Sequence, residues 1–344
     1  MIKNKLDKNI AEDTTMKSNV EILTGIRPTG DLTVANYLGA VKPILEMQKN
    51  GKTPVLFVAD LHAMTTNEPA EVAKYSRGII ADYLALGVDP SKTTIYLQSD
   101  IAGQTTTLMT YLSRHISVAD LLRVPTLKEK MKTENEEKLK TANALLFLYP
   151  VMMAADILIQ RAKSVPVGED QVAHLEVSRK LANRFNKRYG NVFPVPKLMQ
   201  VKALRLLSLR GDGKMSKSNP AGAIFLTDPI ETVKQKIKKA ETAFEKQMNE
   251  RLKSHILLIK GLCETEKQKK QVDEIISQHK NGKAVMGEFK QLMTEIIDNF
   301  LEDFQSKRAK ITTSHVNHVL EAGAKIAQKN ANETLSLVNK ALFN

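Results

Sequence analysis

Two lysines and two serines fill four of the five positions of KMSKS, residues 214–218, within the glycine-flanked segment GDGKMSKSNP. Ammonium groups at this spacing can neutralise phosphate oxygens, and the glycines allow a loop to move. A segment that cannot bury an apolar face is also typical of a linker. These residues alone leave both interpretations open.

A second candidate is Asp156, because it stands inside the apolar segment MAADILI. An unpaired buried carboxylate is strongly destabilising. We therefore expect Asp156 to have a partner, either in a bound ligand or in the protein, as a helix cap or a core ion pair. Nearby, VPVGEDQ (165–171) predicts a short strand that ends at Gly168 and presents Asp170 and Gln171 as acceptors for a ribose hydroxyl or an amine.

The segment GIRPTGDLTVAN (25–36) predicts a strand that ends at Ile26, a turn, and a helix that begins at Val34 with Thr33 as its cap. Free backbone N–H groups at such a helix start favour an anion, and Gly30 permits the close approach of a nucleotide. A plain strand-turn-helix connection has the same pattern, so the segment is a weak signal by itself.

These candidates need a scaffold, and the chain alternates β-rich runs with helical patterns from about residue 21 to residue 170. The runs that predict strands include EILTGI (21–26), TPVLFVAD (53–60) and TTIYLQSD (93–100). This alternation predicts an α/β fold, with a parallel sheet covered by helices on both faces. Ligands bind such sheets where the strands end, so the site candidates are residues 24–30, 60–62 and 98–100.

After Pro220 the composition shifts to long helical segments that are rich in lysine and glutamate. We expect a catalytic domain over residues 21–225 and a separate, all-helical domain over residues 226–344. The charged residues 1–20 fit neither a signal peptide nor a transit peptide and predict a flexible extension.

The chain of 344 residues has a formal net charge of +13, which favours a polyanionic partner such as nucleic acid or a nucleotide. A lysine-rich solvated surface gives the same charge, so charge alone does not decide. The single cysteine, Cys263, excludes a disulfide within the chain and is typical of a reducing, cytoplasmic setting. The longest uncharged run, residues 141–155, is too short to span a bilayer, so we expect no membrane segment.

His315 and His318 lie three residues apart in a helical pattern and could share a metal, but no third ligand stands nearby. A solvated helix face is the favoured interpretation, and we expect no metal site built by the protein.

The motifs KMSKS, TVAN (33–36) and VGEDQVAHLE together resemble those of the class I aminoacyl-tRNA synthetases, with TVAN where the HIGH motif of that class falls. The segments YPVMMAADIL, LFVADLHA and RVPTLKEK are similar, in the same order, to those of the bacterial-type tryptophanyl-tRNA synthetase family. The resemblance covers nearly the whole chain from about residue 21. It implies a Rossmann-like nucleotide-binding sheet and a tRNA anticodon-binding role for the helical domain.

The resemblance also implies a tryptophan pocket, in which Asp156 accepts a hydrogen bond from the indole N–H. The pocket has an apolar wall, a histidine beside it, and two groups that hold the ammonium of the amino acid, Tyr149 and Gln171. The other matching positions are Leu23, His62, Met153, Val165 and Val167.

For ATP, the resemblance implies contacts from the turn after the first strand, the helix start, the ribose motif and the KMSKS loop. The matching positions are Arg27, Pro28, Thr29, Thr33, Ala35, Asn36, Gly168, Glu169, Asp170, Leu206, Lys214, Met215, Ser216, Lys217 and Ser218. The residues expected to act in catalysis are Lys214, Lys217, Lys130, Thr33 and Asn36.

Three positions depart from the family pattern. Ala35 stands where glycine is usual, Arg27 replaces a common glutamine, and Leu23 occupies a position that many members give to an aromatic residue. Arg27 adds a cation near the expected phosphates, and Ala35 adds a methyl group where the adenine would pass.

The implied reaction is attack of the tryptophan carboxylate on the α-phosphorus of ATP, followed by transfer to the terminal ribose of tRNA(Trp). It needs alignment and charge neutralisation by lysines and Mg²⁺, and no protein nucleophile. The resemblance further implies a homodimer. Two alternatives remain, which are a tyrosine-specific sibling and a non-catalytic RNA-binding paralogue of the same fold.

Overall fold

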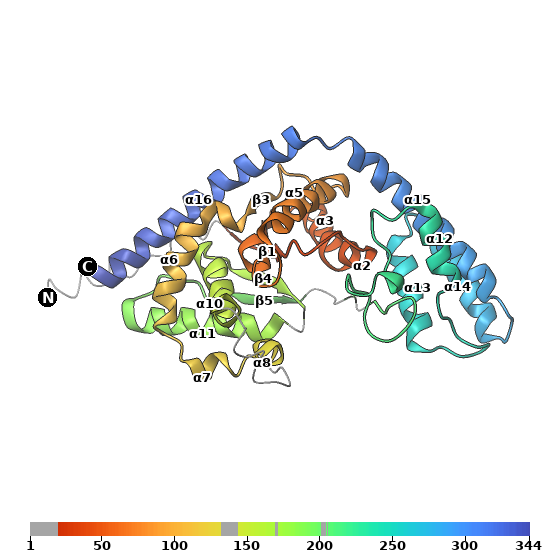
Figure 1. Cartoon of the computed structure of the whole chain (residues 1–344), viewed down its shortest axis with the longest axis horizontal. Coiled ribbons are helices and arrows are strands. Elements are labelled where there is room, and N and C mark those ends of the chain that lie inside the picture. Colours follow the sequence, from red (N-terminus) through yellow and green to blue (C-terminus); the bar gives the residue numbers. More distant parts are fainter. Residues whose placement is uncertain (1–19, 132–143, 169–170, 201–203, 205) are drawn as a thin grey trace.

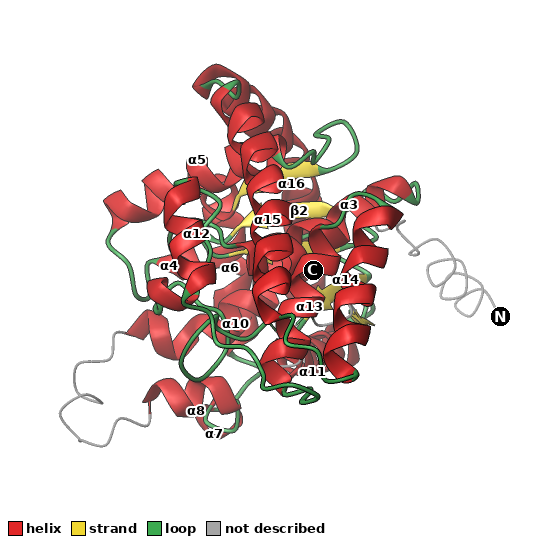
Figure 2. Ribbon diagram, turned by 90° about the vertical axis from the view of Figure 1, so that its right-hand side faces the viewer, coloured by secondary structure: helices red, strands yellow, loops and turns green. Residues whose placement is uncertain are grey.

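The computed structural model describes residues 20–131, 144–168, 171–200, 204 and 206–344. Short parallel strands lie at the centre of the larger part of the molecule, inside a shell of helices (Figures 1 and 2). The strands are β1 (Leu23–Ile26), β2 (Val55–Val58), β3 (Thr94–Leu97), β4 (Ser164–Val167) and β5 (Lys197–Gln200).

The strands run in the order β3-β2-β1-β4-β5. β1 pairs with β2 and β2 with β3, while β4 pairs with β5, and every pair is parallel. A parallel bridge between Ile22 and Ser164 joins β1 to β4. The predicted α/β fold with a parallel sheet is therefore confirmed, and its first three strands lie within the segments predicted for them.

Helices cover both faces of the sheet because its central strands are apolar on both faces. In β2 all four residues are buried, with Leu56 and Val58 on one face and Val55 and Phe57 on the other. The first face packs against α3 (Lys42–Lys49) and α5 (Pro69–Ala85), and the second against α6 (Ala102–Ser113), α10 (Ala144–Ile159) and α11 (Val172–Tyr189). The shorter elements here are α2 (Val34–Asn36), η1 (Tyr37–Val41), α4 (Asp60–Ala63), η2 (Gln98–Ile101), α7 (Val118–Leu121) and α8 (Pro125–Met131).

The helical part of the molecule follows η4 (Pro220–Gly222) and lies to the right in Figure 1. It contains α12 (Ile230–Lys238), α13 (Glu250–Leu262), α14 (Glu266–Lys280) and α15 (Met286–Ala309). The chain enters it beside the start of α2, where the Val34 N–H donates to the Ile224 carbonyl at 3.0 Å and the Leu226 N–H donates to the Leu32 carbonyl at 2.9 Å. The KMSKS segment therefore leads directly into a backbone pairing with the segment that precedes α2.

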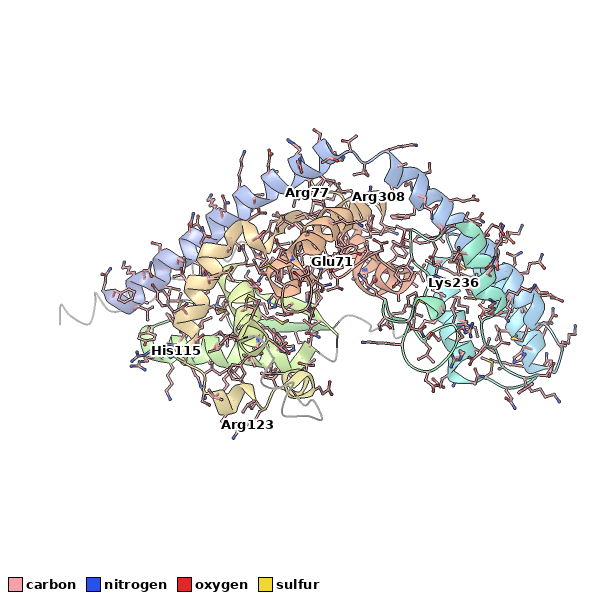
Figure 3. All side chains as sticks on the ribbon, in the orientation of Figure 1. Glu71, Arg77, His115, Arg123, Lys236 and Arg308 are labelled. Atoms are coloured by element: carbon pink, nitrogen blue, oxygen red, sulfur yellow. The ribbon has the colours of Figure 1, made fainter. Side chains whose placement is uncertain are left out.

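The last helix, α16 (Thr313–Phe343), leaves the helical part and runs back across the sheet (Figure 1). Its Ala327, Ala331 and Val338 join the core that contains Val55 and Phe57. Near the turn between α15 and α16, Arg308 donates from Nε to the buried Asp82 of α5 at 2.7 Å (Figure 3). The segment predicted as one helical domain, 226–344, therefore also contributes the later part of α16 to the core of the sheet, whereas Val316, Val319 and Leu320 at its start join the cluster that includes α12–α15.

Gly323 allows α16 to lie directly on the edge strand β3. A Cβ at this position would come 1.8 Å from the Ile95 carbonyl oxygen, whereas nothing lies within 4 Å of a Cβ at Gly78 in α5. We expect Gly323→Ala to lower the free energy of unfolding by about 1–3 kcal/mol, because the backbone of β3 has to shift. Gly78→Ala is the matched control and should be neutral or stabilising by up to about 1 kcal/mol. Equal unfolding midpoints for Gly323→Ala and the wild type in urea would contradict this packing.

Candidate active site

A cavity of about 560 Å³ lies between β1, β4, α3 and α10. This volume is within the range of about 300–1,000 Å³ that is typical of small-molecule sites. Most of its lining is apolar, and the strands supply the residues around Leu23 and Val165. The first residues after these strands, Arg27 and Gly168, bring polar groups to its edge. The cavity therefore lies where ligands are expected in a parallel sheet.

Seven of the eight residues expected around tryptophan line this cavity. They are Leu23, His62, Tyr149, Met153, Val165, Val167 and Gln171. The eighth, Asp156, is 1% exposed and does not belong to the lining. Its hydrogen-bond partner His62 does line the cavity.

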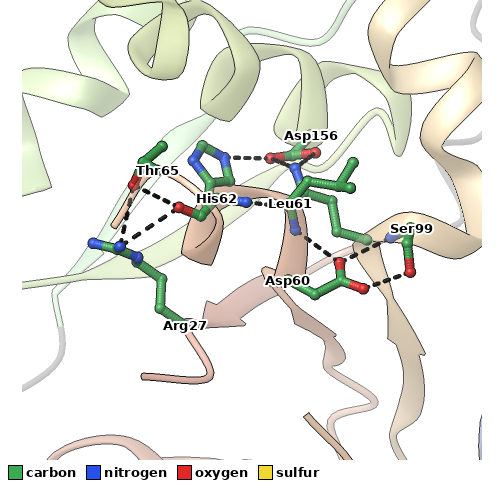
Figure 4. A network of polar contacts seen from close by, with 8 residues as sticks. Arg27, Asp60, Leu61, His62, Thr65, Ser99 and Asp156 are labelled. Carbon is green, nitrogen blue, oxygen red and sulfur yellow. Dashed lines mark hydrogen bonds and ion pairs between the residues drawn. The ribbon is translucent and has the colours of Figure 1, made fainter. Parts of the chain in front are cut away.

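Asp156 has protein partners on both carboxylate oxygens (Figure 4). His62 Nε2 lies 2.9 Å from Oδ2, and Gln98 Nε2 donates to Oδ1 and Oδ2 at 2.9 Å each. Burial raises the pKa of Asp156, and the bonds from His62 and Gln98 act in the opposite direction. The sequence prediction that this carboxylate has a partner is confirmed, and the partner in the structure is part of the protein.

Gln98 also sets the position of His62, because its Oε1 accepts a hydrogen bond from the His62 N–H at 3.2 Å. Beside this pair, Asp60 Oδ1 accepts from the Ser99 N–H at 3.0 Å and Oδ2 accepts from the Ser99 hydroxyl at 2.5 Å (Figure 4). Hydrogen bonds thus connect the residues that follow β2 and β3. The two candidate ranges that follow these strands form one network, but the role of Gln98 was not predicted.

Arg27 brings a cation to the cavity. Its Nη2 donates to the Thr65 hydroxyl at 3.3 Å, with the His62 carbonyl at 3.5 Å (Figure 4). The same nitrogen also donates to the Thr66 hydroxyl at 3.0 Å. Burial lowers the pKa of Arg27, but a guanidinium remains charged at neutral pH. With Nη2 engaged, the rest of the guanidinium is available to an anionic group in the cavity.

Tyr149 belongs to a second polar group in the cavity wall. Its hydroxyl lies 2.8 Å from the Thr126 hydroxyl and 3.3 Å from His174 Nε2, and Thr126 lies 2.8 Å from the same nitrogen. Thr126 and His174 were not predicted, although both line the cavity. His174 could have been predicted from the sequence, since it lies three residues after Gln171 and therefore on the same side of α11.

The start of α2 is closed by a pair of side chains. The Thr33 hydroxyl accepts from the Asn36 N–H at 3.3 Å, and Asn36 Oδ1 accepts from the Thr33 N–H at 3.0 Å. The predicted cap by Thr33 is confirmed. Immediately after Asn36 the helix widens into the π-turn η1, a feature that is frequent at functional sites. Neither Thr33 nor Asn36 lines the cavity, and Ala35 packs partly buried against the core.

The KMSKS segment lies outside the cavity lining and forms one side of a short hairpin. Met215 is buried, and its N–H donates to the Leu206 carbonyl at 2.8 Å, whereas Lys214 is exposed. Lys217 is half-buried and donates from Nζ to the Gly30 carbonyl at 2.5 Å. Burial lowers the pKa of Lys217 to about 8, although Asp31 and Asp82 oppose this shift.

The remaining ATP candidates divide into two sets. Pro28, Thr29, Leu206, Ser216 and Ser218 are not part of the cavity lining, and of the candidates for ATP only Arg27 and Gly168 are. Glu169, Asp170 and the side chain of Lys130 lie outside the residues that the structure describes.

His315 and His318 are both exposed on α16, as a solvated helix face requires. Within the described ranges, no three or more His, Cys, Asp or Glu side chains gather where they could hold a metal ion. None of the helices described combines the length and hydropathy needed to cross a membrane.

The sequence matches the family model of class I tRNA synthetases for tryptophan and tyrosine over residues 15–302. Among similar proteins, the tryptophan–tRNA ligase of Chlamydia caviae is 33% identical over 95% of this chain and 96% of its own length. The tryptophan–tRNA ligase of Ureaplasma parvum is 38% identical over 83% of this chain and 87% of its own length.

The fold is similar to that of solved tryptophanyl-tRNA synthetases. The Mycoplasma pneumoniae structure superposes with a TM-score of 0.80 at 30% identity, covering 94% of this chain and 97% of the other. The Campylobacter jejuni structure, complexed with ADP and tryptophan, gives a TM-score of 0.78 at 29% identity over 93% of this chain and 99% of the other.

Proposed function

This chain belongs to the class I tRNA synthetases for tryptophan and tyrosine, and on that premise we propose that it is a tryptophan–tRNA ligase. It activates L-tryptophan with ATP and transfers the aminoacyl group to tRNA(Trp), with release of AMP and pyrophosphate. The main support for tryptophan as the substrate is the cavity, because seven of the eight residues expected around that amino acid line it. The similarity to ligases for tryptophan supports the same choice.

We assign the indole to the apolar part of the cavity, between Met153, Val165 and Val167. Met153 offers a polarizable thioether to the ring. Asp156 recognises the indole N–H through His62: in the tautomer that donates Nε2–H to the carboxylate, the other ring nitrogen, Nδ1, is an acceptor. Direct contact between Asp156 and the indole requires His62 to move first.

In the first step, a carboxylate oxygen of tryptophan forms a bond to the α-phosphorus of ATP as the bond to the leaving pyrophosphate breaks. Arg27 lies closest to this exchange among the described cations, because it lines the cavity. Lys214 and Lys217 neutralise the departing phosphates once the KMSKS segment closes on ATP. A polar site without a protein nucleophile is sufficient, because the reaction proceeds by alignment and charge neutralisation.

In the second step, a ribose hydroxyl of the terminal adenosine of the tRNA attacks the adenylate carbonyl, and AMP leaves. Mg²⁺ belongs to this proposal as an ion that arrives with ATP, because the phosphate oxygens supply its preferred ligands. The anticodon role of the helical part, the homodimer and the cytoplasmic location also belong to it, on the strength of the family resemblance.

Pyrophosphate exchange that depends on the amino acid tests this function. We expect exchange with tryptophan and none with tyrosine, since a phenol hydroxyl would find the apolar wall at Val165 and Val167. Exchange with tyrosine alone would assign the chain to the tyrosine branch. Binding of tRNA without adenylate formation from any amino acid would make it a non-catalytic paralogue.

The charge on Lys217 predicts a pH dependence. Because its pKa is about 8 in the free protein, Lys217 is protonated below this pH and loses its charge as the pH rises through it. We expect kcat/KM for ATP, which reports ionisations of the free enzyme, to fall above about pH 8. Lys217→Arg should remove this decline, since arginine remains charged up to a pH of about 12. An identical decline in the Lys217→Arg variant would assign the ionisation to another group.

A further inference from the structure

The turn that precedes KMSKS is held by the helical part of the molecule. Leu206–Leu209 and Gly213–Met215 form the two sides of a hairpin, in which the Ser208 N–H donates to the Gly213 carbonyl at 3.1 Å. The glycines at its tip have φ of +71° at Gly211 and +91° at Gly213, a conformation that other residues rarely adopt. This explains the sequence RGDG, whose tight turn needs glycine at both places.

Arg251, at the start of α13, grips this turn. Its Nη1 donates to the Gly211 carbonyl at 2.7 Å and to the Ser208 carbonyl at 3.0 Å, so that one nitrogen spans the turn. The Arg251 side chain is 17% exposed, and its Nε forms an ion pair with Glu241 Oε2 at 3.3 Å. Because both acceptors are backbone carbonyls, these bonds fix the path of the chain independently of the side chains of the turn.

Glu241 and Ser254 also bind this turn, and we call the hydrogen bonds from Arg251, Glu241 and Ser254 to residues 207–211 the grip. Glu241 Oε1 accepts from the Gly211 N–H at 2.9 Å, and the Glu241 N–H donates to the Leu209 carbonyl at 2.9 Å. One turn further along α13, the Ser254 hydroxyl accepts from the Leu207 N–H at 2.7 Å. Five hydrogen bonds thus fasten residues 207–211 to the helical part.

The other end of the hairpin contacts the sheet part, through Lys217 and the Gly30 carbonyl. Lys214 and Lys217 therefore stand between an anchor on α13 and an anchor on the loop after β1. For Lys217 to reach phosphates, the contact with Gly30 has to open while the stem keeps its place. The position of the stem then decides where the freed ammonium group points.

We propose that Arg251 is a positioning residue for amino acid activation, which fixes the stem of the KMSKS hairpin on α13 so that Lys217 reaches the transition state. The proposal rests on the ligase function proposed above. Arg251 contacts neither the cavity nor, in the mechanism, the substrates, and acts only through the lysine that the stem carries. The grip also connects the position of that lysine to the placement of the helical part.

The test is a double-mutant cycle in tryptophan-dependent pyrophosphate exchange. Arg251→Ala should lower kcat by about tenfold and leave KM for tryptophan within about twofold. In a Lys217→Ala background the same change should lower kcat by less than about twofold, because residues that act as a unit are not additive. Arg251→Lys should recover part of the rate, since an ammonium can bond the same carbonyls with less favourable geometry.

Lys253→Ala is the matched control, because Lys253 is a cation on the same helix whose Nζ pairs with Glu250 Oε1 at 2.7 Å. It should leave kcat unchanged. If Arg251→Ala does not fold, Glu241→Gln replaces it, since the amide keeps an acceptor for the Gly211 N–H and loses the ion pair with Arg251; we expect a loss of about threefold that also vanishes in the Lys217→Ala background.

An unchanged kcat in Arg251→Ala, or the same fold-loss with and without Lys217, overturns the proposal. So does a rise in KM for tryptophan that accompanies the fall in kcat, because it indicates general damage to the fold. If the wild-type protein shows no exchange with any amino acid, the ligase function itself is contradicted. If the wild type is active and Arg251→Ala has the same kcat, only the positioning role of Arg251 is contradicted.

Discussion

We expect the replacement of Lys217 with alanine to lower kcat for tryptophan activation by about 100-fold and to change KM for tryptophan by less than about threefold. A loss of 100-fold corresponds to about 2.7 kcal/mol of transition-state stabilisation. The reason lies in the ground-state position of this side chain. Its ammonium group is bound to the Gly30 carbonyl and does not line the cavity, so it contributes little until negative charge develops on the leaving phosphates.

Two comparisons identify the role of the ammonium group. Lys217→Arg retains the charge and should lose less activity than the alanine variant. Lys239→Ala removes an exposed lysine at the end of α12 and should match the wild type, which controls for the overall charge of the protein. If Lys217→Ala raises KM for ATP and leaves kcat unchanged, the contact is made equally in the ground state and the loop does not act on the transition state.

Local patterns were sufficient to predict the scaffold of the site. The four buried residues of β2 read as an apolar run before Asp60, and Thr33 stood one residue before a helical pattern. In both cases the residues that predict the element belong to it or directly precede it, because strand burial and helix capping depend on neighbours in sequence. Seven of the eight residues that the family resemblance assigns to tryptophan line one cavity, and their role there stays a prediction.

The partners of these residues could not be predicted in the same way. Gln98 bonds to Asp156 across 58 positions of the chain, and although its place after a strand made it a site candidate, nothing in the sequence identified Asp156 as its partner. The return of α16 depends on Gly323 fitting against Ile95, which is a property of shape that composition does not reveal. Arg251 was likewise one of many cations in a charged helix until its two carbonyl partners were located.

We expect the replacement of Asp156 with alanine to raise KM for tryptophan by about 30-fold to 100-fold and to change KM for ATP by less than about threefold. Hydrogen bonds to charged groups contribute about 1.5–3 kcal/mol, which corresponds to factors of about 10 to 150. The substitution removes the partner that orients His62 Nε2, and the histidine then loses the tautomer and position in which it meets the indole. ATP should retain its contacts, because the Asp156 carboxylate bonds to the side chains of His62 and Gln98, neither of which is expected to contact ATP.

We expect the rise in KM for tryptophan in Asp156→Ala to result from the lost hydrogen bond to His62. His62→Ala alone should raise KM for tryptophan by a similar factor, and the double variant should be little worse than either single variant, because both remove the same contact. Asp60→Asn weakens a neighbouring buried network that faces Ser99, so any loss there should fall equally on tryptophan and ATP. Isothermal titration with tryptophan measures the same difference without catalysis. Additive losses in the double variant would mean that Asp156 contributes to tryptophan binding independently of His62, as it would in direct contact with the indole.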